Sequence, residues 1–332
     1  SISLGAGFSS AEKVALSFGI RQENAFGSGN YLAVEVNTSK FNRNLVLSTT
    51  DPYFTQNGIS RTVDVFHRTS RPYLGDVNAY SLINSGAGLR FGVPVTESDT
   101  VFMGINAEQT EIREGTGLPD AYRKYAEKFG STRSALPFTL GWARDQRDSA
   151  LVPTKGALQR INADVSLAGD VRYARASYQF QQYFPLSKKY TLAFNADVGW
   201  GQGLNGQDYP LFKHFYVGGL GSVRGFEQST LGPSEVTNST SAVPVYLGGP
   251  KKLVFNAEFI TPFPGAGNDK TLRLFGFTDA GRAFGQDETV SFGDLRVSAG
   301  VGLSWISPMG PLRFSYATPI REQTGDEIQR LQ

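Results

Sequence analysis

The sequence has 332 residues, and its 32 lysines and arginines nearly balance 30 aspartates and glutamates, giving a net charge of +2. The absence of cysteine excludes a disulfide scaffold and a thiolate metal site, and the charge distribution disfavours a nucleic-acid partner. No apolar run reaches the roughly eighteen residues of a transmembrane helix. The 38 glycines and an aromatic fraction of 12% favour an all-β chain.

The first residues alternate between apolar and small or polar side chains. Ile2, Leu4 and Phe8 share one parity, whereas Gly5 and Gly7 share the other. Successive side chains of a strand point to opposite faces, so this pattern predicts a strand with one apolar face. The alternation returns in residues 14–21, 190–200 and 295–305. Each segment is about ten residues long, which is the span of a tilted membrane strand.

A soluble β-sandwich also alternates, but two further patterns favour a membrane barrel. Aromatic residues gather at strand ends, as expected of an interfacial girdle; they are Tyr53, Phe54, Tyr183, Phe184, Trp200 and Trp305. The polar face carries glycine and charge, as expected of a wet lumen; the charged positions are Arg175, Asp197, Arg273, Arg296 and Arg313.

We therefore predict an all-β fold, a 16-stranded antiparallel transmembrane β-barrel that occupies residues 1–332. The predicted strand centres are Gly5, Ser17, Val34, Leu47, Val65, Gly88, Gly104, Thr139, Ala163, Ser177, Asn195, Asn256, Phe275, Gly300 and Ser315, and a sixteenth strand begins near Ile328.

Connection lengths predict how the barrel is oriented. Short turns such as 186–189 and 307–310 follow even-numbered strands, whereas the long insertions 113–134 and 201–249 follow odd-numbered ones. Outer-membrane barrels have short periplasmic turns and long external loops, so the amino terminus is expected in the periplasm. Residues 119–129 are expected to form a short amphipathic surface helix without a function of its own.

The segment 216–233 carries the most specific signal in the chain. It is rich in glycine and centres on Val223, Arg224, Gly225 and Phe226, so we expect an external loop that folds back into the lumen. A half-buried guanidinium needs an anionic partner. Parity places Glu258 on the inward face of its strand, and Asp279 shares the parity of Arg273, so both carboxylates are candidate partners. A purely structural salt bridge that braces the lumen is the alternative.

These motifs together resemble the BamA family of outer-membrane protein assembly factors. The family's V-R-G-F loop matches residues 223–226, its G-F-x-D-x-G strand matches residues 276–281, and Glu258 occupies its inward acidic position. The resemblance implies that the loop docks on Glu258 and Asp279 inside the lumen. Further matching stretches are 50–54, 147–156 and 302–316.

The resemblance also implies a function, which is folding and inserting client barrel proteins into the outer membrane of Gram-negative bacteria. The implied partners are the lipid bilayer, unfolded outer-membrane proteins and the lipoproteins of the assembly machinery; no cofactor is expected. The family's periplasmic polypeptide-transport-associated (POTRA) domains are not found in this sequence, which opens directly on a strand without a signal peptide. The closing strand is expected to be abbreviated, because the sequence stops short of the family's terminal aromatic residue.

A lateral gate between the first and last strands is the implied site of insertion. The expected gate residues lie in the first strand and are Ser3, Leu4, Gly5, Ala6 and Gly7. Glycine weakens strand pairing, which suits an edge that exchanges partners, although glycine would equally fit a crowded barrel corner.

An export pore and an enzyme are the two other functions to consider. A passive or substrate-specific export pore, such as a two-partner secretion transporter, shares the V-R-G-F loop and stays open as the alternative. An enzyme is not expected, because the two histidines, His67 and His214, are far apart in sequence and have no triad or metal-ligand spacing around them.

Overall fold

The computed structural model describes residues 1–332 except 11, 72–79, 116–117, 237–243, 267–270 and 308–309. The wall strands are β1 (Ile2–Ser9), β2 (Lys13–Gln22), β3 (Tyr31–Thr38), β4 (Asn42–Asp51), β5 (Ser60–Ser70), β6 (Tyr80–Pro94), β7 (Asp99–Glu114), β8 (Thr132–Asp145), β9 (Gly156–Gly169), β10 (Tyr173–Pro185), β11 (Thr191–Gly203), β15 (Lys251–Pro262), β16 (Leu272–Phe284), β17 (Arg296–Ser307) and β18 (Gly310–Arg321). Inside this wall lie β12 (Gly225–Phe226), β13 (Ser234–Val236), β14 (Pro244–Tyr246) and β19 (Ile328–Gln329). The helix α1 spans Asp120–Phe129, and short 3-10 helices span Ala25–Gly27, Leu211–Lys213 and Phe292–Asp294.

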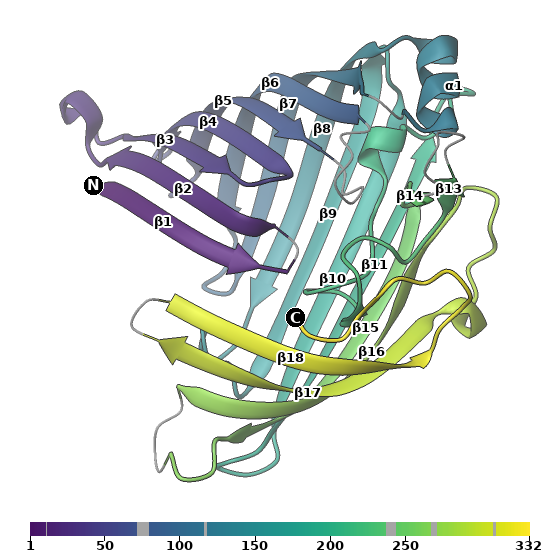
Figure 1. Ribbon diagram of the computed structural model, residues 1–332. Coiled ribbons are helices and arrows are strands. Elements are labelled where there is room, and N and C mark those ends of the chain that lie inside the picture. Colours follow the sequence, from purple (N-terminus) through teal and green to yellow (C-terminus); the bar gives the residue numbers. More distant parts are fainter. Residues whose placement is uncertain (11, 72–79, 116–117, 237–243, 267–270, 308–309) are drawn as a thin grey trace.

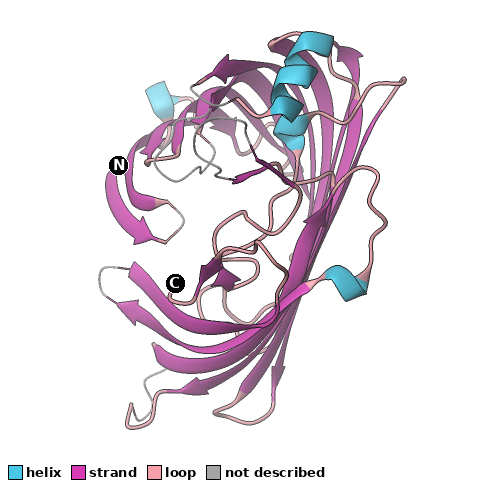
Figure 2. Cartoon of the chain, turned by 45° about the vertical axis from the view of Figure 1, so that its right-hand side comes forward, coloured by secondary structure: helices cyan, strands magenta, loops and turns pink. Residues whose placement is uncertain are grey.

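The wall is one antiparallel sheet in which each strand pairs with the next wall strand along the chain. It curls around a lumen, and Figures 1 and 2 place the two end strands, β1 and β18, on the same side of the barrel. Within the described residues the sheet contains 15 strands, and β1 and β18 are not hydrogen-bonded to each other. The predicted total of sixteen wall strands was therefore too high by one.

The sixteenth strand is replaced by a short segment that turns toward the lumen. Residues 328–332 run antiparallel to the middle of β18, where Ser315 and Gln332 exchange backbone hydrogen bonds and Ala317 donates to Arg330. On its other side the segment pairs with β12, through Gly225–Gln329 and Phe226–Ile328. The segment divides its backbone hydrogen bonds between the wall and the lumen, so it does not reach β1.

The apolar parity of the strands faces outward, as the alternation predicts. Leu4 of β1 is 81% exposed, Val65 of β5 is 55% exposed and Val301 of β17 is 64% exposed. Polar groups of the opposite parity are buried within the lumen, among them Asp279 and Ser298. Large apolar side chains on the outside and buried polar groups on the inside reverse the order of a soluble protein, and this is the arrangement of a membrane barrel.

The core lies in the lumen, where the connection between β11 and β15 folds back under α1 (Figure 2). Tyr122 and Tyr125 of the helix are buried together with Tyr80 of the wall and with Val245 and Leu247 of the connection. The helix is amphipathic, as expected: its tyrosines pack into the core, whereas its charged residues stay exposed. None of the described helices is both long and apolar enough to cross a membrane.

The strands differ in length around the wall. The first strand has 8 residues and β3 also has 8, whereas β6 has 15 and β7 has 16. The strands near the amino terminus therefore form a lower wall than those under the long loops (Figure 1).

Candidate functional site

The lumen loop, which we define as residues 204–250 between β11 and β15, owes its course to left-handed glycines. Gly218, Gly219, Gly221 and Gly225 all have positive φ values, between 83° and 120°. Side chains at such φ values are strained, so glycine lets the chain reverse without cost from a Cβ. At Gly225 (φ 91°) a Cβ would also lie 3.0 Å from the Cβ of Ala317 in β18. The loop therefore approaches the wall so closely at Gly225 that a Cβ there would press against β18.

Apolar packing holds the tip of the loop against the wall. Val217, Val223, Phe226 and Leu231 form a buried cluster with Val254 of β15 and Ala283 of β16. Val223 and Phe226 have no exposed surface. Burying a side chain of this size stabilises a fold by roughly 1.5–3 kcal/mol, so the two side chains anchor the segment that presents Arg224.

Arg224 lies between two carboxylates from neighbouring strands. Its backbone N–H and its Nε donate to Asp279 Oδ2 at 3.0 and 2.7 Å, and Nη2 donates to Asp279 Oδ1 at 2.7 Å. The remaining Nη1 donates to Glu258 Oε1 at 2.7 Å. The guanidinium also stacks on the ring of Phe277, 3.6 Å from its centroid. These contacts use the planar fork of arginine on both edges and on one face.

The two carboxylates differ in their surroundings. Asp279 has no exposed surface, and Asn256 Nδ2 also donates to its Oδ1 at 2.8 Å. The side chain of Glu258 is 16% exposed and accepts a second ion pair from Arg313 Nη2 at 2.5 Å. Arg313 in turn stacks over Phe275 at 4.1 Å. The loop arginine is thus linked through Glu258 to β18, the last strand of the wall.

The charges in this cluster compensate for their burial. Burial alone would lower the pKa of Arg224, but the hydrogen bonds and charges of Asp279 and Glu258 raise the pKa above its ordinary value. The guanidinium is therefore charged at every physiological pH. Removing one member of a buried pair leaves the other charge uncompensated, which costs far more than the net contribution of the pair.

Three residues that contact the arginine cluster or the lumen loop were not predicted, although strand parity indicates two of them. Parity puts Asn256 on the face of Glu258 and puts Phe277 on the face of Asp279, so alternation could have found both. No sequence signal marked Gln332, whose Nε2 donates to the carbonyl oxygen of Phe226 at 2.7 Å. That contact depends on the loop and the final segment meeting in three dimensions.

A second set of contacts holds the base of the loop near α1. Lys213 Nζ lies 2.6 Å from Glu108 Oε1 of β7, and Lys128 of α1 pairs with Asp208 at 2.7 Å. His214 stacks on Tyr209 and its Nδ1 lies 2.8 Å from the carbonyl oxygen of Leu247. Burial lowers the pKa of His214 to about 4, against the weaker effect of that hydrogen bond. His214 is therefore a neutral packing residue at the loop base.

A family model for the Omp85 superfamily domain matches residues 24–332. The chain belongs to the Omp85 superfamily. The whole chain is 36% identical to outer membrane protein assembly factor BamA of Neisseria meningitidis and covers 46% of that protein. It is 28% identical to BamA of Nitratidesulfovibrio vulgaris over 96% of the chain and 39% of the relative. The chain thus spans less than half the length of these curated relatives.

Two solved structures have a similar fold. BamA from Haemophilus ducreyi lacking POTRA domains 1–3 matches with a TM-score of 0.92 and 26% identity, over 100% of this chain and 68% of that one. CdiB from Acinetobacter baumannii matches with a TM-score of 0.60 and 13% identity over 99% of this chain and 57% of that one, a likeness that shows the fold alone.

The expected gate residues form one edge of the sheet, whereas the arginine cluster contacts strands at the other edge. Ser3, Leu4, Gly5, Ala6 and Gly7 belong to β1 and pair with β2, and all five are exposed. A Cβ on Gly5 would lie 2.3 Å from Ser17 Oγ, whereas a Cβ on Gly7 would meet open space. The structure therefore gathers the loop and its acids in one place and leaves the gate residues at the edge of the sheet.

No group of three or more histidine, cysteine, aspartate or glutamate side chains within the described ranges has the geometry of a metal site. The chemistry of the arginine cluster is ionic and static, since Arg224 contacts acids and aromatic rings that hold its fork on several sides. Such a cluster braces the loop against the wall.

Proposed function

We propose that the chain is the outer-membrane barrel of an assembly factor that folds and inserts client barrel proteins. The observation that carries the proposal is the likeness over the full chain to BamA of Neisseria meningitidis, at 36% identity. Unfolded outer-membrane proteins would be its clients, and lipoproteins of an assembly complex its accessory partners. The proposal assigns it no enzymatic step. Residues 1–332 would form one barrel domain, with the amino terminus in the periplasm.

The free edge of the sheet supports a gate at the β1 edge. Among the residues that the structure describes, β1 pairs with β2 on one side and β18 does not pair with β1 on the other. In lipid, unpaired backbone donors and acceptors are costly, so an incoming strand that pairs with this edge is favoured. Addition of a strand to an exposed edge is a common mode of peptide recognition. A client strand would therefore enter along Ser3–Gly7.

Depletion distinguishes an assembly factor from an export pore. Loss of an assembly factor is expected to remove many different barrels from the outer membrane. Loss of a secretion transporter would abolish one exported partner and leave the barrels in place. Quantitative proteomics of the outer membrane after depletion measures both outcomes, and unchanged barrel levels would refute the proposal.

Site-specific crosslinking tests the proposed gate. Because the chain has no cysteine, Gly7→Cys introduces the only thiol, and the open space at that position tolerates it. A client that carries single cysteines in its terminal strand is expected to form a disulfide with Gly7→Cys during insertion. Leu140→Cys is the matched control, because Leu140 is 46% exposed on β8, which is paired on both sides. Equal crosslinking at the two sites would argue against the gate.

A further inference from the structure

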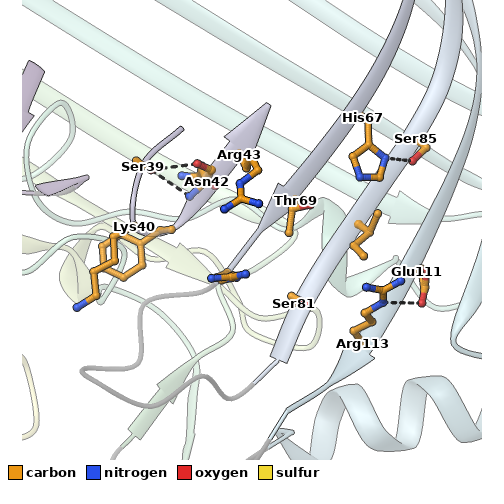
Figure 3. A pocket seen from close by; sticks show the side chains of 13 residues that line it. Ser39, Lys40, Asn42, Arg43, His67, Thr69, Ser81, Ser85, Glu111 and Arg113 are labelled. Atoms are coloured by element: carbon orange, nitrogen blue, oxygen red, sulfur yellow. Dashed lines mark hydrogen bonds and ion pairs between the residues drawn. The ribbon is translucent and has the colours of Figure 1, made fainter. Parts of the chain in front are cut away.

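A polar depression lies on the outer face of the wall, where β4 and β6 begin and β5 and β7 end (Figure 3). It has a volume of about 350 Å³. We call it the outer rim patch, and its chemistry-bearing side chains are Lys40, Arg43, His67, Arg71, Ser85 and Arg113. Strand pairing joins Arg43 to Thr69, and His67 to Ser85, across neighbouring strands. The patch is therefore built from the outward parity of several strands.

The outer rim patch is strongly cationic. Among the described residues that line it, Lys40, Arg43, Arg71 and Arg113 are cationic and Glu111 is the one carboxylate, which lies 3.0 Å from Arg113 Nε. Among the residues that the structure describes, the guanidinium groups of Arg43 and Arg71 make no hydrogen bond or ion pair, and both residues are exposed. Guanidinium groups bind phosphate through two parallel hydrogen bonds, so these two are available for an anion.

The patch borders directly on the apolar surface of the wall. On β4, Arg43 precedes Leu45 by two residues on the same face, and lies roughly 7 Å nearer the turn formed by residues 39–41. On β5, His67 and Thr69 continue the row of Val63 and Val65, which are 40% and 55% exposed. A tilted membrane strand changes from hydrocarbon to headgroup surroundings over this distance. The cations therefore lie at the depth of lipid headgroups.

We infer that the outer rim patch binds a membrane lipid whose headgroup carries net negative phosphate, with Arg43 and Arg71 as its principal phosphate contacts. The acyl chains of the lipid lie on the apolar rows of β4 and β5, and the hydroxyl of Ser85 and the ring of His67, which are 2.7 Å apart, offer further polar contacts. The leaflet concerned rests on the proposed orientation, which places this end of the wall at the cell exterior. A soluble anion would gain nothing from the adjoining apolar rows, which favours a lipid.

Lipid binding can be measured with purified protein in nanodiscs of zwitterionic lipid doped with lipid A, a phosphorylated glycolipid. We expect bound lipid A to be retained in native mass spectrometry and to be released as salt concentration rises. Dephosphorylated lipid A is expected to bind at least about tenfold more weakly. Equal retention of the two lipids would overturn the inference. Full displacement by millimolar inorganic phosphate would also overturn it, because the site would then be a simple anion site.

Charge variants locate the lipid on the protein. The double variant Arg43→Gln with Arg71→Gln is expected to weaken lipid A binding about tenfold to thirtyfold, because each cation near a membrane surface contributes a factor of several. Lys188→Gln with Lys189→Gln removes two exposed cations from a turn at the opposite end of the wall and is the matched control. Equal affinities of the two double variants would place the lipid elsewhere.

A charge-preserving variant and a readout that does not depend on orientation complete the test. If the glutamine variant fails to fold, Arg43→Lys with Arg71→Lys keeps the charge but not the paired hydrogen bonds, so it is expected to lose only part of the binding; complete loss of binding in that folded variant contradicts charge-based recognition. Nanodiscs present the lipid in both leaflets and the readout is binding. The result therefore depends neither on the orientation of the barrel nor on its insertion activity.

Discussion

Arg224 shows how much of the lumen depends on a single side chain. Its fork contacts two acids from adjacent strands, its plane covers Phe277, and its backbone N–H binds Asp279 as well. Because Asp279 is fully buried, the arginine is its main source of compensating charge. The residue therefore joins the loop to the wall by charge, whereas Val223 and Phe226 join it by packing.

We expect Arg224→Ala to destabilise the folded barrel by about 3–5 kcal/mol, because it leaves a buried carboxylate unpaired. The measurement is the temperature at which the protein loses its folded mobility in electrophoresis. The unfolding temperature of Arg224→Lys should lie between those of the wild-type protein and Arg224→Ala, since lysine keeps the charge but not the planar fork of donors. Arg123→Ala, at an exposed arginine of α1, is the control. Below its unfolding temperature, Arg224→Ala is also expected to insert clients poorly; normal assembly and full activity would contradict this.

Gly225→Ala tests whether the loop needs glycine for its backbone and also for its close approach to the wall. The substitution adds a left-handed strain of roughly 1–2 kcal/mol and a 3.0 Å contact with Ala317. Gly206→Ala, at φ 75° in the same loop but with open space around its Cβ, carries the strain alone. We expect Gly225→Ala to expose the loop to protease more than Gly206→Ala does. Equal sensitivity would show that the contact relaxes.

His214 gives the loop base a pH dependence. The folded pKa of about 4 is below the ordinary value of 6.5, so the neutral ring contributes stability that is fully present above pH 6.5. That contribution is lost as the pH falls from 6.5 toward 4. We expect the unfolding temperature of the wild-type protein to fall more steeply over this range than that of His214→Gln. Parallel pH curves for the two proteins would contradict the prediction.

At the scale of elements, α1 covers the core of the lumen with its apolar face. Tyr122 is fully buried and its ring lies 4.5 Å from that of Tyr80, while the backbone N–H of Ala121 donates to Glu235 of β13 at 3.0 Å. The helix therefore fixes the outer half of the lumen loop through both packing and hydrogen bonding.

Tyr122→Ala is expected to cost about 3–5 kcal/mol, as other large-to-small core changes do, and to release α1 and β13 together. Hydrogen exchange would detect faster exchange in both segments. Lys124→Ala, at an exposed position on the same helix, should leave exchange unchanged. If Tyr122→Ala speeds exchange in α1 but leaves β13 protected, the two elements are held independently.

The wall and part of the site follow from local rules in the sequence. Alternation identifies the strands and places Glu258 and Asp279 on the inward face, because side-chain parity is fixed by the backbone. The course of residues 328–332 could not be predicted, since it depends on hydrogen bonds to β18 and to β12 that are distant in sequence. The packing partners of α1 could not be predicted for the same reason, because its amphipathic pattern does not reveal which surface its apolar face meets.

At the scale of the whole molecule, the unequal strand lengths matter for the surrounding lipid. A span of the hydrocarbon core takes about 9–11 tilted residues. With 8 residues, β3 falls short of that length, whereas β7 with 16 exceeds it. A short apolar wall is accommodated by local thinning of the bilayer, at a cost of fractions of a kcal/mol per Å.

We therefore expect bilayer thickness to act on one side of the barrel. Hydrogen exchange of β3 should quicken as the acyl chains of the nanodisc lipid are lengthened, whereas exchange of β7 and β8 should change little. A uniform response of the three strands would contradict this expectation.

The short strands make the bilayer beside them locally thinner. Lipids next to β3 would have to compress or tilt their acyl chains, so the barrier to moving a polar backbone through them is lowered there. The barrel would then act on the bilayer as well as on the client, because its shape determines where the membrane is thinnest.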